Sequence, residues 1–321
     1  MDEIFNRATV KESTSKVTYM ISDKDISVVV QGPIHTQDNL TKRVLESVRT
    51  HLPDAELILS TWKGSNVDGL DCDILLLNDD PGAINGLNNV NRQIVSTRNG
   101  LQKATRTYAM KLRTDTFLTG TGFIDAFDKY PERREDFKVF ERKIVIPTHY
   151  TRNPKRPYTY SVFGSFFHIS DIFHFGLKKD LNLLWSAPLA VKWDMAPEQH
   201  IWISCLNLLN RNINWFKLNL YQQYKYSEIS IINNFNIETP ERLGIKLPLH
   251  LTDDHAVSCY TADEVELLVK KHLIEKSNFI SVSTLLSIGF SYMLKWFEGR
   301  TFHFGFRRMT MNIYGQLLSK S

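Results

Sequence analysis

Short apolar runs and helical stripes alternate along the first part of the chain. Apolar runs at 26–34, 55–62 and 72–82 each end in turn-forming residues, which is typical of buried strands in a parallel sheet. Between the first two runs, apolar residues recur at helical spacing over 40–51, and Pro53 stops the pattern. The alternation predicts a strand, a helix and two further strands, in that order.

A second helix and a fourth strand are expected next. One helical face extends from Ile94 to Tyr108, with an interruption at Asn99 and Gly100, and the run 108–118 is typical of a strand. This order of elements predicts an α/β fold with a mixed, mostly parallel sheet flanked by helices.

The rest of the chain has a weaker pattern. The segment 119–254 is aromatic-rich, with a helix expected near Pro197, and the end of the chain is expected to be mainly helical. We therefore predict three parts: a polar leader (1–20), the sheet domain (21–254) and a helical, basic and aromatic C-terminal extension (255–321).

The composition narrows the class of protein. The chain has 321 residues, 42% apolar and 23% charged, which is ordinary for a soluble globular protein. Its three cysteines are odd in number and not in metal-binding spacing, which favours a reducing compartment. The polar leader lacks the apolar core of a signal peptide, and the uncharged run 277–294 contains five serines, so neither secretion nor a transmembrane helix is expected.

The positive charge is concentrated at the C-terminus. The net charge is +4, and residues 291–321 contain five basic residues and one acidic residue. A nucleic-acid-binding protein usually carries a basic stripe across its fold, so we expect no nucleic-acid partner.

Polar residues follow the predicted strands, and the carboxyl ends of parallel strands meet at the edge where such sheets bind ligands. The candidate donor-binding residues at this edge are Gln31, Gly32, Pro33, Ser60, Thr61, Trp62, Asp79 and Asp80. Neither the dinucleotide nor the P-loop glycine signature follows the first strand. Two alternatives remain open: Trp62 as a core residue, and the two aspartates as turn formers.

The fourth strand ends in a charged triplet. Side chains alternate along a strand, so Lys111, Arg113 and Asp115 are expected to share one face. Asp115 could hold a divalent cation (Mg²⁺ or Mn²⁺) that binds a diphosphate, and the cations Lys111, Arg113, Arg92 and Arg98 could neutralise the diphosphate directly. The alternative is a salt bridge between Arg113 and Asp115 on a solvated edge.

These motifs, taken in order, carry a family resemblance. The layout resembles the GT-A glycosyltransferases, and VVVQGPI, LILSTWKG, NDDPG, NRQIVST-NGL and YAMKLRTD together resemble the WavE lipopolysaccharide-synthesis family. The resemblance implies a GT-A-like domain, a nucleotide-diphosphate sugar donor, and a lipopolysaccharide or capsular polysaccharide acceptor that is lipid-linked. It departs from the GT-A pattern at Arg113, where these enzymes usually have the first acid of Asp-x-Asp.

Sugar transfer to a hydroxyl with inversion requires a general base. Glu198, in the first turn after Pro197, is our first candidate, and Asp171, before an aromatic segment, is the second. Either acid could instead be a helix-terminus or turn residue.

Two other groups of residues are weaker candidates. His250 and His255 could add a late metal ligand, although surface histidines are the more common case. A basic turn at 151–158 contains Arg152, Lys155 and Arg156, which we expect to be solvated rather than bound to phosphate.

The C-terminal extension predicts membrane contact. An amphipathic helix at 285–297 is expected to pack its apolar stripe on the sheet domain, whereas 300–314 interleaves phenylalanines with arginines, as a segment on an anionic membrane surface does. The expected location is cytoplasmic, peripheral at the inner face of the bacterial cytoplasmic membrane. The rival functions are a sugar nucleotidyltransferase and a non-catalytic scaffold for envelope-glycan assembly.

Overall fold

The computed structural model describes residues 21–84, 89–156, 164–192, 195–208, 217–248, 251 and 258–298. The predicted leader, the segment 299–321, and the histidines at 250 and 255 lie outside these ranges.

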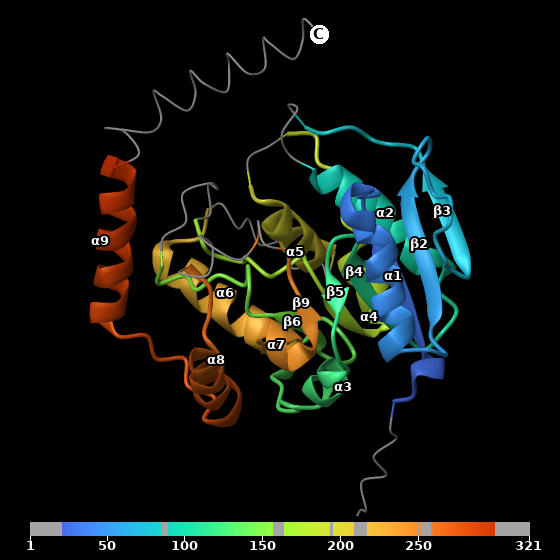
Figure 1. Cartoon of the computed structure of the whole chain (residues 1–321). Coiled ribbons are helices and arrows are strands. Elements are labelled where there is room, and N and C mark those ends of the chain that lie inside the picture. Colours follow the sequence, from blue (N-terminus) through green and yellow to red (C-terminus); the bar gives the residue numbers. More distant parts are fainter. Residues whose placement is uncertain are drawn as a thin grey trace, which may run out of the picture.

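The centre of the molecule is a seven-stranded sheet of order β3-β2-β1-β4-β7-β6-β8 (Figure 1). Its strands are β1 (Ile26–Gln31), β2 (Glu56–Trp62), β3 (Ile74–Asn78), β4 (Tyr108–Arg113), β6 (Ile144–Pro147), β7 (His174–Leu177) and β8 (Phe235–Glu238). Among these strands only β7 is antiparallel to its neighbours. The predicted α/β class with a mostly parallel mixed sheet is confirmed, and the arrangement is consistent with a GT-A-type fold.

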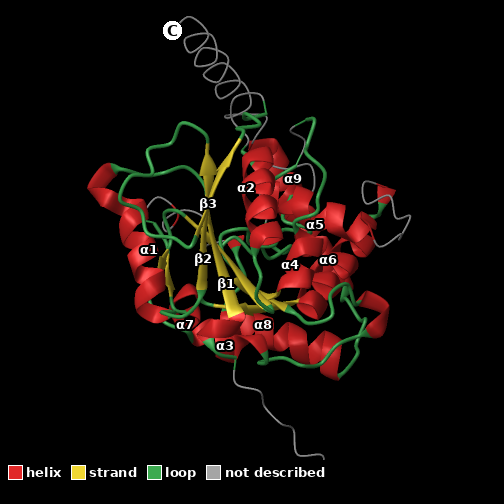
Figure 2. Ribbon diagram, turned by 90° about the vertical axis from the view of Figure 1, so that its right-hand side faces the viewer, coloured by secondary structure: helices red, strands yellow, loops and turns green. Residues whose placement is uncertain are grey.

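Helices cover both faces of the sheet, as Figure 2 shows. One face carries α1 (Leu40–His51), α3 (Gly122–Phe127) and α7 (Pro240–Leu243). The other carries α2 (Val90–Lys103), α4 (Lys178–Leu184), α5 (Pro197–Leu208), α6 (Leu220–Asn234) and α8 (Ala262–Val269). Along β1, Val29 enters the core under α2 while Val28 and Val30 enter the core under α1, so all three are buried. This two-sided burial explains the continuous apolar run that predicted the strand.

Two local predictions are corrected. Helix α2 continues through Asn99 and Gly100 instead of being interrupted there. A Cβ atom on Gly100 would lie 2.3 Å from Cγ1 of Val29, so the glycine allows close contact between helix and strand. The fourth strand ends at Arg113, and β5 (Phe117–Leu118) pairs with β9 (Ile245–Lys246) in a separate two-stranded sheet.

The chain ends, within the described residues, in helices. After α8, a turn of π-helix (Lys270–Ile274) precedes α9 (Val282–Glu298), which lies at the far left of Figure 1, opposite β3. The described part of the predicted extension, 258–298, is therefore mainly helical. None of the described helices combines the length and apolarity needed to span a bilayer.

Candidate functional site

The carboxyl ends of β1, β2 and β3 are joined to α2 by a buried hydrogen-bond network. The Ser96 hydroxyl donates to Oε1 of Gln31 at 2.6 Å, and the Ser60 hydroxyl donates to the Ser96 carbonyl at 2.7 Å. Asn78 Nδ2 donates to Ser60 Oγ at 2.9 Å, and Asn99 Nδ2 donates to Asn78 Oδ1 at 2.8 Å. The predicted residues Gln31 and Ser60 are thus buried and bonded within the fold. They hold the strand ends against α2, together with Ser96 and Asn78, which lie in the quoted motifs but were not predicted as donor-binding residues.

The turn after β1 packs against the tip of β4. Gly32 has φ of +128°, a conformation that favours glycine, and a Cβ atom there would lie 3.0 Å from Oγ1 of Thr114. The Thr114 hydroxyl donates to the Pro33 carbonyl at 2.7 Å. After β2, Thr61 is buried and Trp62 is half-buried. The contacts of Gly32 and Pro33 with Thr114 therefore hold the turn after β1 against the end of β4.

Arg92 and Asp80 form a two-bond ion pair at the start of α2. Nε and Nη2 of Arg92 donate to the two Asp80 oxygens, both at 2.7 Å, and the guanidinium lowers the pKa of that carboxyl. Asp80 also accepts from the Gly82 backbone N–H at 2.9 Å, so the same carboxylate stabilises the turn and pairs with Arg92. Asp79 is exposed and paired with Lys63 at 2.8 Å. Arg98 lies in the second half of α2, next to Asn99.

The tip of β4 carries a second two-bond ion pair. Nε and Nη2 of Arg113 donate to the two oxygens of Asp115 at 2.8 and 2.7 Å. The Asp115 side chain is 3% exposed and that of Arg113 is 27% exposed. The salt bridge that the sequence offered as an alternative is present, but it is mostly buried rather than on a solvated edge.

This pairing bears on the expected divalent cation. Both Asp115 oxygens accept from a guanidinium, and the described residues contain no group of three His, Cys, Asp or Glu side chains placed to hold a metal ion. Asp115 is therefore already paired with a cationic side chain, and the divalent cation stays a prediction.

Lys111 is directed into the protein. Its side chain is fully buried, and Nζ donates to the backbone carbonyls of Asp171 and Ile172. It also lies 5.2 Å from the ring centre of Trp185, and burial lowers its pKa to about 8. The direct contact with a diphosphate that the sequence suggested is not available in this arrangement. Lys111 instead fixes the backbone that carries Asp171.

The two candidate bases come together near the β4 tip. Glu198 lies in the first turn of α5 and Asp171 lies just before β7, yet the charge of Asp171 acts on Glu198. Burial, and secondly the Asp171 charge, raise the pKa of Glu198 to about 8, whereas Arg152 and Lys111 act in the opposite direction. Asp171 also acts on Arg113. One buried cluster therefore contains both carboxyl groups and the end of the charged strand.

Arg152 belongs to this cluster, so the expectation of a solvated basic turn is wrong for it. The residue is 1% exposed, and its Nε donates to Nε2 of His168 at 3.3 Å. His168 Nδ1 faces the Tyr150 carbonyl at 2.9 Å, which assigns the proton to Nδ1. Burial and the Arg152 charge hold the pKa of His168 well below its usual range. A neutral His168 therefore stands 3.7 Å from the Glu198 carboxyl.

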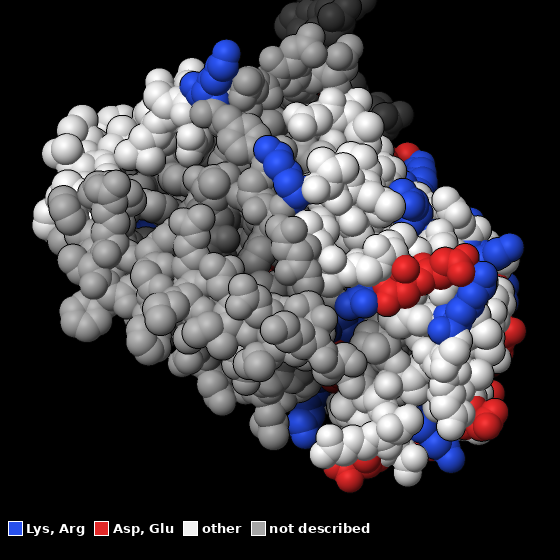
Figure 3. Space-filling model, turned by 90° about the horizontal axis from the view of Figure 1, so that it is seen from above, with Lys and Arg blue, Asp and Glu red and all other residues white. Residues whose placement is uncertain are grey.

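The face above the strand ends, seen in Figure 3, carries basic and acidic side chains side by side on its described part. No single sign of charge dominates there.

Comparison with known proteins gives the family. A search among curated proteins found no significant match. The family model described as WavE lipopolysaccharide synthesis matches residues 26–296, from the first residue of β1 into α9. The match includes every strand and both ion pairs described above, and the chain therefore belongs to the WavE lipopolysaccharide synthesis family.

Proposed function

We propose that this protein is a glycosyltransferase that moves a sugar from a nucleotide-diphosphate sugar to a lipid-linked lipopolysaccharide or capsular acceptor. The observation that carries the proposal is the β4 tip, where Arg113 is paired with Asp115 and the charge of Asp171 acts on both Arg113 and Glu198, at the edge where α/β sheets bind ligands. Membership of a lipopolysaccharide synthesis family supplies the pathway.

The donor diphosphate is proposed to meet Arg113. A guanidinium binds phosphate oxygens in the same two-bond geometry that it uses with Asp115, and its side chain retains some exposure. Asp115 keeps the guanidinium at the strand tip before the donor arrives. Arg92, held in the same way by Asp80, is the second candidate contact, for the ribose or the distal phosphate.

The acceptor hydroxyl is proposed to lose its proton to Glu198. The bond from the sugar carbon to the diphosphate oxygen breaks as the acceptor oxygen bonds to that carbon, and the nucleoside diphosphate leaves with the electron pair. A base with a pKa of about 8 suits proton transfer near neutral pH, and the negative charge of Asp171 contributes to that basicity. Arg113 stabilises the charge that develops on the leaving diphosphate.

The test is donor hydrolysis and transfer over a panel of UDP-, GDP- and CMP-sugars, with release of free nucleotide as the signal. The proposal expects turnover with a UDP- or GDP-sugar, whereas turnover with CMP-sugars alone, which carry a single phosphate, would contradict the proposed diphosphate contact. Release of pyrophosphate from a nucleoside triphosphate would indicate a nucleotidyltransferase instead. If no nucleotide shifted the melting temperature and none was released, a non-catalytic scaffold would be the better account.

The proposed location is the cytoplasmic face of the membrane, because nucleotide sugars and growing lipid-linked acceptors meet there. The expected contact of the basic tail with anionic lipid belongs to this proposal.

A further inference from the structure

Helix α9 is attached to the protein by one of its faces. Ile288 is 1% exposed, and the ring of Tyr292 stacks on Phe166 with centroids 5.7 Å apart. The Tyr292 hydroxyl also accepts from the Ser165 backbone N–H at 2.9 Å. The expected packing of this helix on the rest of the protein therefore holds for its inner face.

The outer face of α9 is also apolar. Val282, Leu286, Phe290 and Met293 are 71%, 68%, 58% and 46% exposed, and their spacing of three or four residues places them along one side of the helix. We call these four side chains the outer stripe. Contiguous exposed apolar patches mark interaction surfaces, whereas the outer face of a helix that contacts only water is polar.

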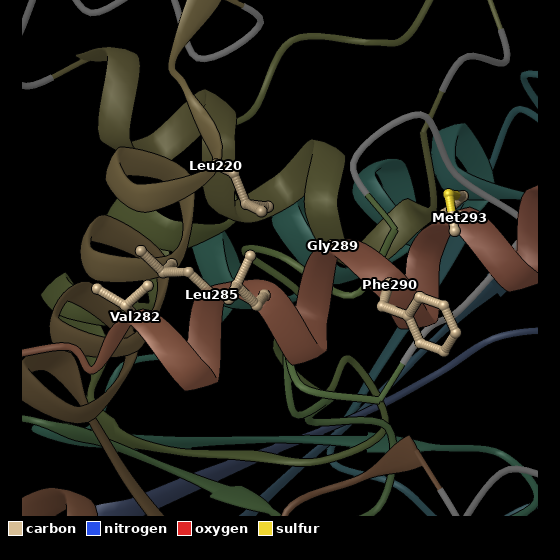
Figure 4. A pocket seen from close by; sticks show the side chains of 7 residues that line it. Leu220, Val282, Leu285, Gly289, Phe290 and Met293 are labelled. Carbon is tan, nitrogen blue, oxygen red and sulfur yellow. The ribbon is translucent and has the colours of Figure 1, made fainter.

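A shallow groove extends the outer stripe toward α6. It has a volume of about 460 Å³ and lies between the α9 side chains and Leu220, the first residue of α6 (Figure 4). Gly289 forms part of its wall, and all of the residues that line it are apolar or glycine. A lining without hydrogen-bonding side chains suits hydrocarbon better than a peptide or a sugar.

The chain that follows α9 supplies charge of one sign. Residues 299–321 contain four basic residues and no acidic residue, together with Phe302, Phe304 and Phe306. Each lysine or arginine near an anionic leaflet contributes about 1 kcal/mol of attraction, and apolar side chains add the burial term.

We propose that the outer stripe of α9 and its groove insert into the surface of an anionic phospholipid leaflet, with the basic segment beside them. This inference does not depend on the transferase chemistry, because no residue of the outer stripe or its groove belongs to the proposed active site. Docking through α9 would hold the protein at the surface that carries lipid-linked acceptors.

The experiment measures partition of the full chain onto vesicles of phosphatidylcholine with and without phosphatidylglycerol. The test variant is Leu286→Ala/Phe290→Ala, in which alanine preserves helix propensity. The matched control is Leu75→Thr/Leu77→Thr, which removes side chains of 42% and 43% exposure from β3 at the other end of the molecule. Melting curves establish that each variant is folded.

We expect wild type and control to bind the anionic vesicles equally, and the α9 variant to bind at least about tenfold more weakly. Donor turnover in detergent should be unchanged in the α9 variant, which separates this inference from the proposed enzymatic function. Equal vesicle binding by the α9 variant, or no binding by wild type, would overturn the proposal. A wild-type dimer that the α9 variant converts to monomer, without lipid binding, would assign the stripe to a second copy instead.

Discussion

Replacing Glu198 by glutamine should change how the stability of the protein depends on pH. The Glu198 side chain is 10% exposed, and its pKa is raised from the ordinary value of 4.5 to about 8. In the unfolded chain the carboxyl ionises near its ordinary value, whereas in the folded chain it keeps its proton to a much higher pH. The contribution of Glu198 to the free energy of unfolding is therefore fully present at low pH, and it is lost as the pH rises toward 8.

The size of the effect follows from the shift. One unit of pKa difference corresponds to about 1.4 kcal/mol, so wild type should lose about 1.4 kcal/mol per pH unit from this group between roughly pH 5 and pH 8. Glutamine has nearly the same shape and does not titrate. The free energy of unfolding of Glu198→Gln should therefore exceed that of wild type by an amount that grows with pH across this window.

The assay is urea unfolding at several pH values between pH 5 and pH 8.5, compared with Glu266→Gln, which changes an exposed glutamate on α8. The control should follow the wild-type curve. If the Glu198→Gln curve also ran parallel to wild type at every pH, the carboxyl would not hold a raised pKa, and its assignment as a base near pH 8 would fail. In the enzymatic assay, wild-type turnover should rise with pH toward 8, and Glu198→Gln should not show this rise.

Three further predictions concern the architecture of the site. Lys111→Met should lower the free energy of unfolding by about 1–3 kcal/mol, because the carbonyls of Asp171 and Ile172 lose their buried donor; an unchanged urea midpoint would contradict this. Gly100→Ala should also lower the free energy of unfolding. Overpacking against Val29 costs about 1–3 kcal/mol, and the better helix propensity of alanine offsets about 1 kcal/mol of that. Adding Val29→Ala in a double variant should partly restore the stability. Asp80→Asn should lower the free energy of unfolding by less than about 1 kcal/mol, because its ion pair with Arg92 is partly exposed. A larger loss in urea unfolding would contradict this.

The sequence predicted those parts of the fold that depend on local pattern. The predicted runs 26–34 and 55–62 contain β1 and β2, whose apolar side chains are buried on both faces of the sheet. The predicted run 72–82 contains β3, which lies at the edge of the sheet and leaves Leu75 and Leu77 exposed. Helix α1 matches its predicted range because apolar residues at helical spacing were bounded by a clear stop. The predicted interruption of the helix at Gly100 was wrong, because this glycine allows a close contact with β1, which helix propensity does not take into account.

The site was less predictable because its partners come from distant parts of the chain. Arg152 looked like part of a solvated turn, but it pairs with His168 and bridges to Cys259, and both contacts depend on tertiary folding. The alternation of side chains along β4 correctly placed Lys111 and Arg113 on one face, yet it could not show that Lys111 is enclosed. Glu198 and Asp171 were selected one by one, and the effect of the Asp171 charge on Glu198 depends on tertiary packing.

The most direct test of the account is nucleotide release from the sugar-nucleotide panel by wild type, Arg113→Gln and Asp115→Ala. The account predicts turnover by wild type with a UDP- or GDP-sugar. It predicts at least a hundredfold loss in both variants, equivalent to about 2.7 kcal/mol of transition-state stabilisation, with their melting curves still cooperative. Wild-type rates in folded Arg113→Gln and Asp115→Ala would contradict the claim that the tip of β4 meets the phosphates of an activated sugar.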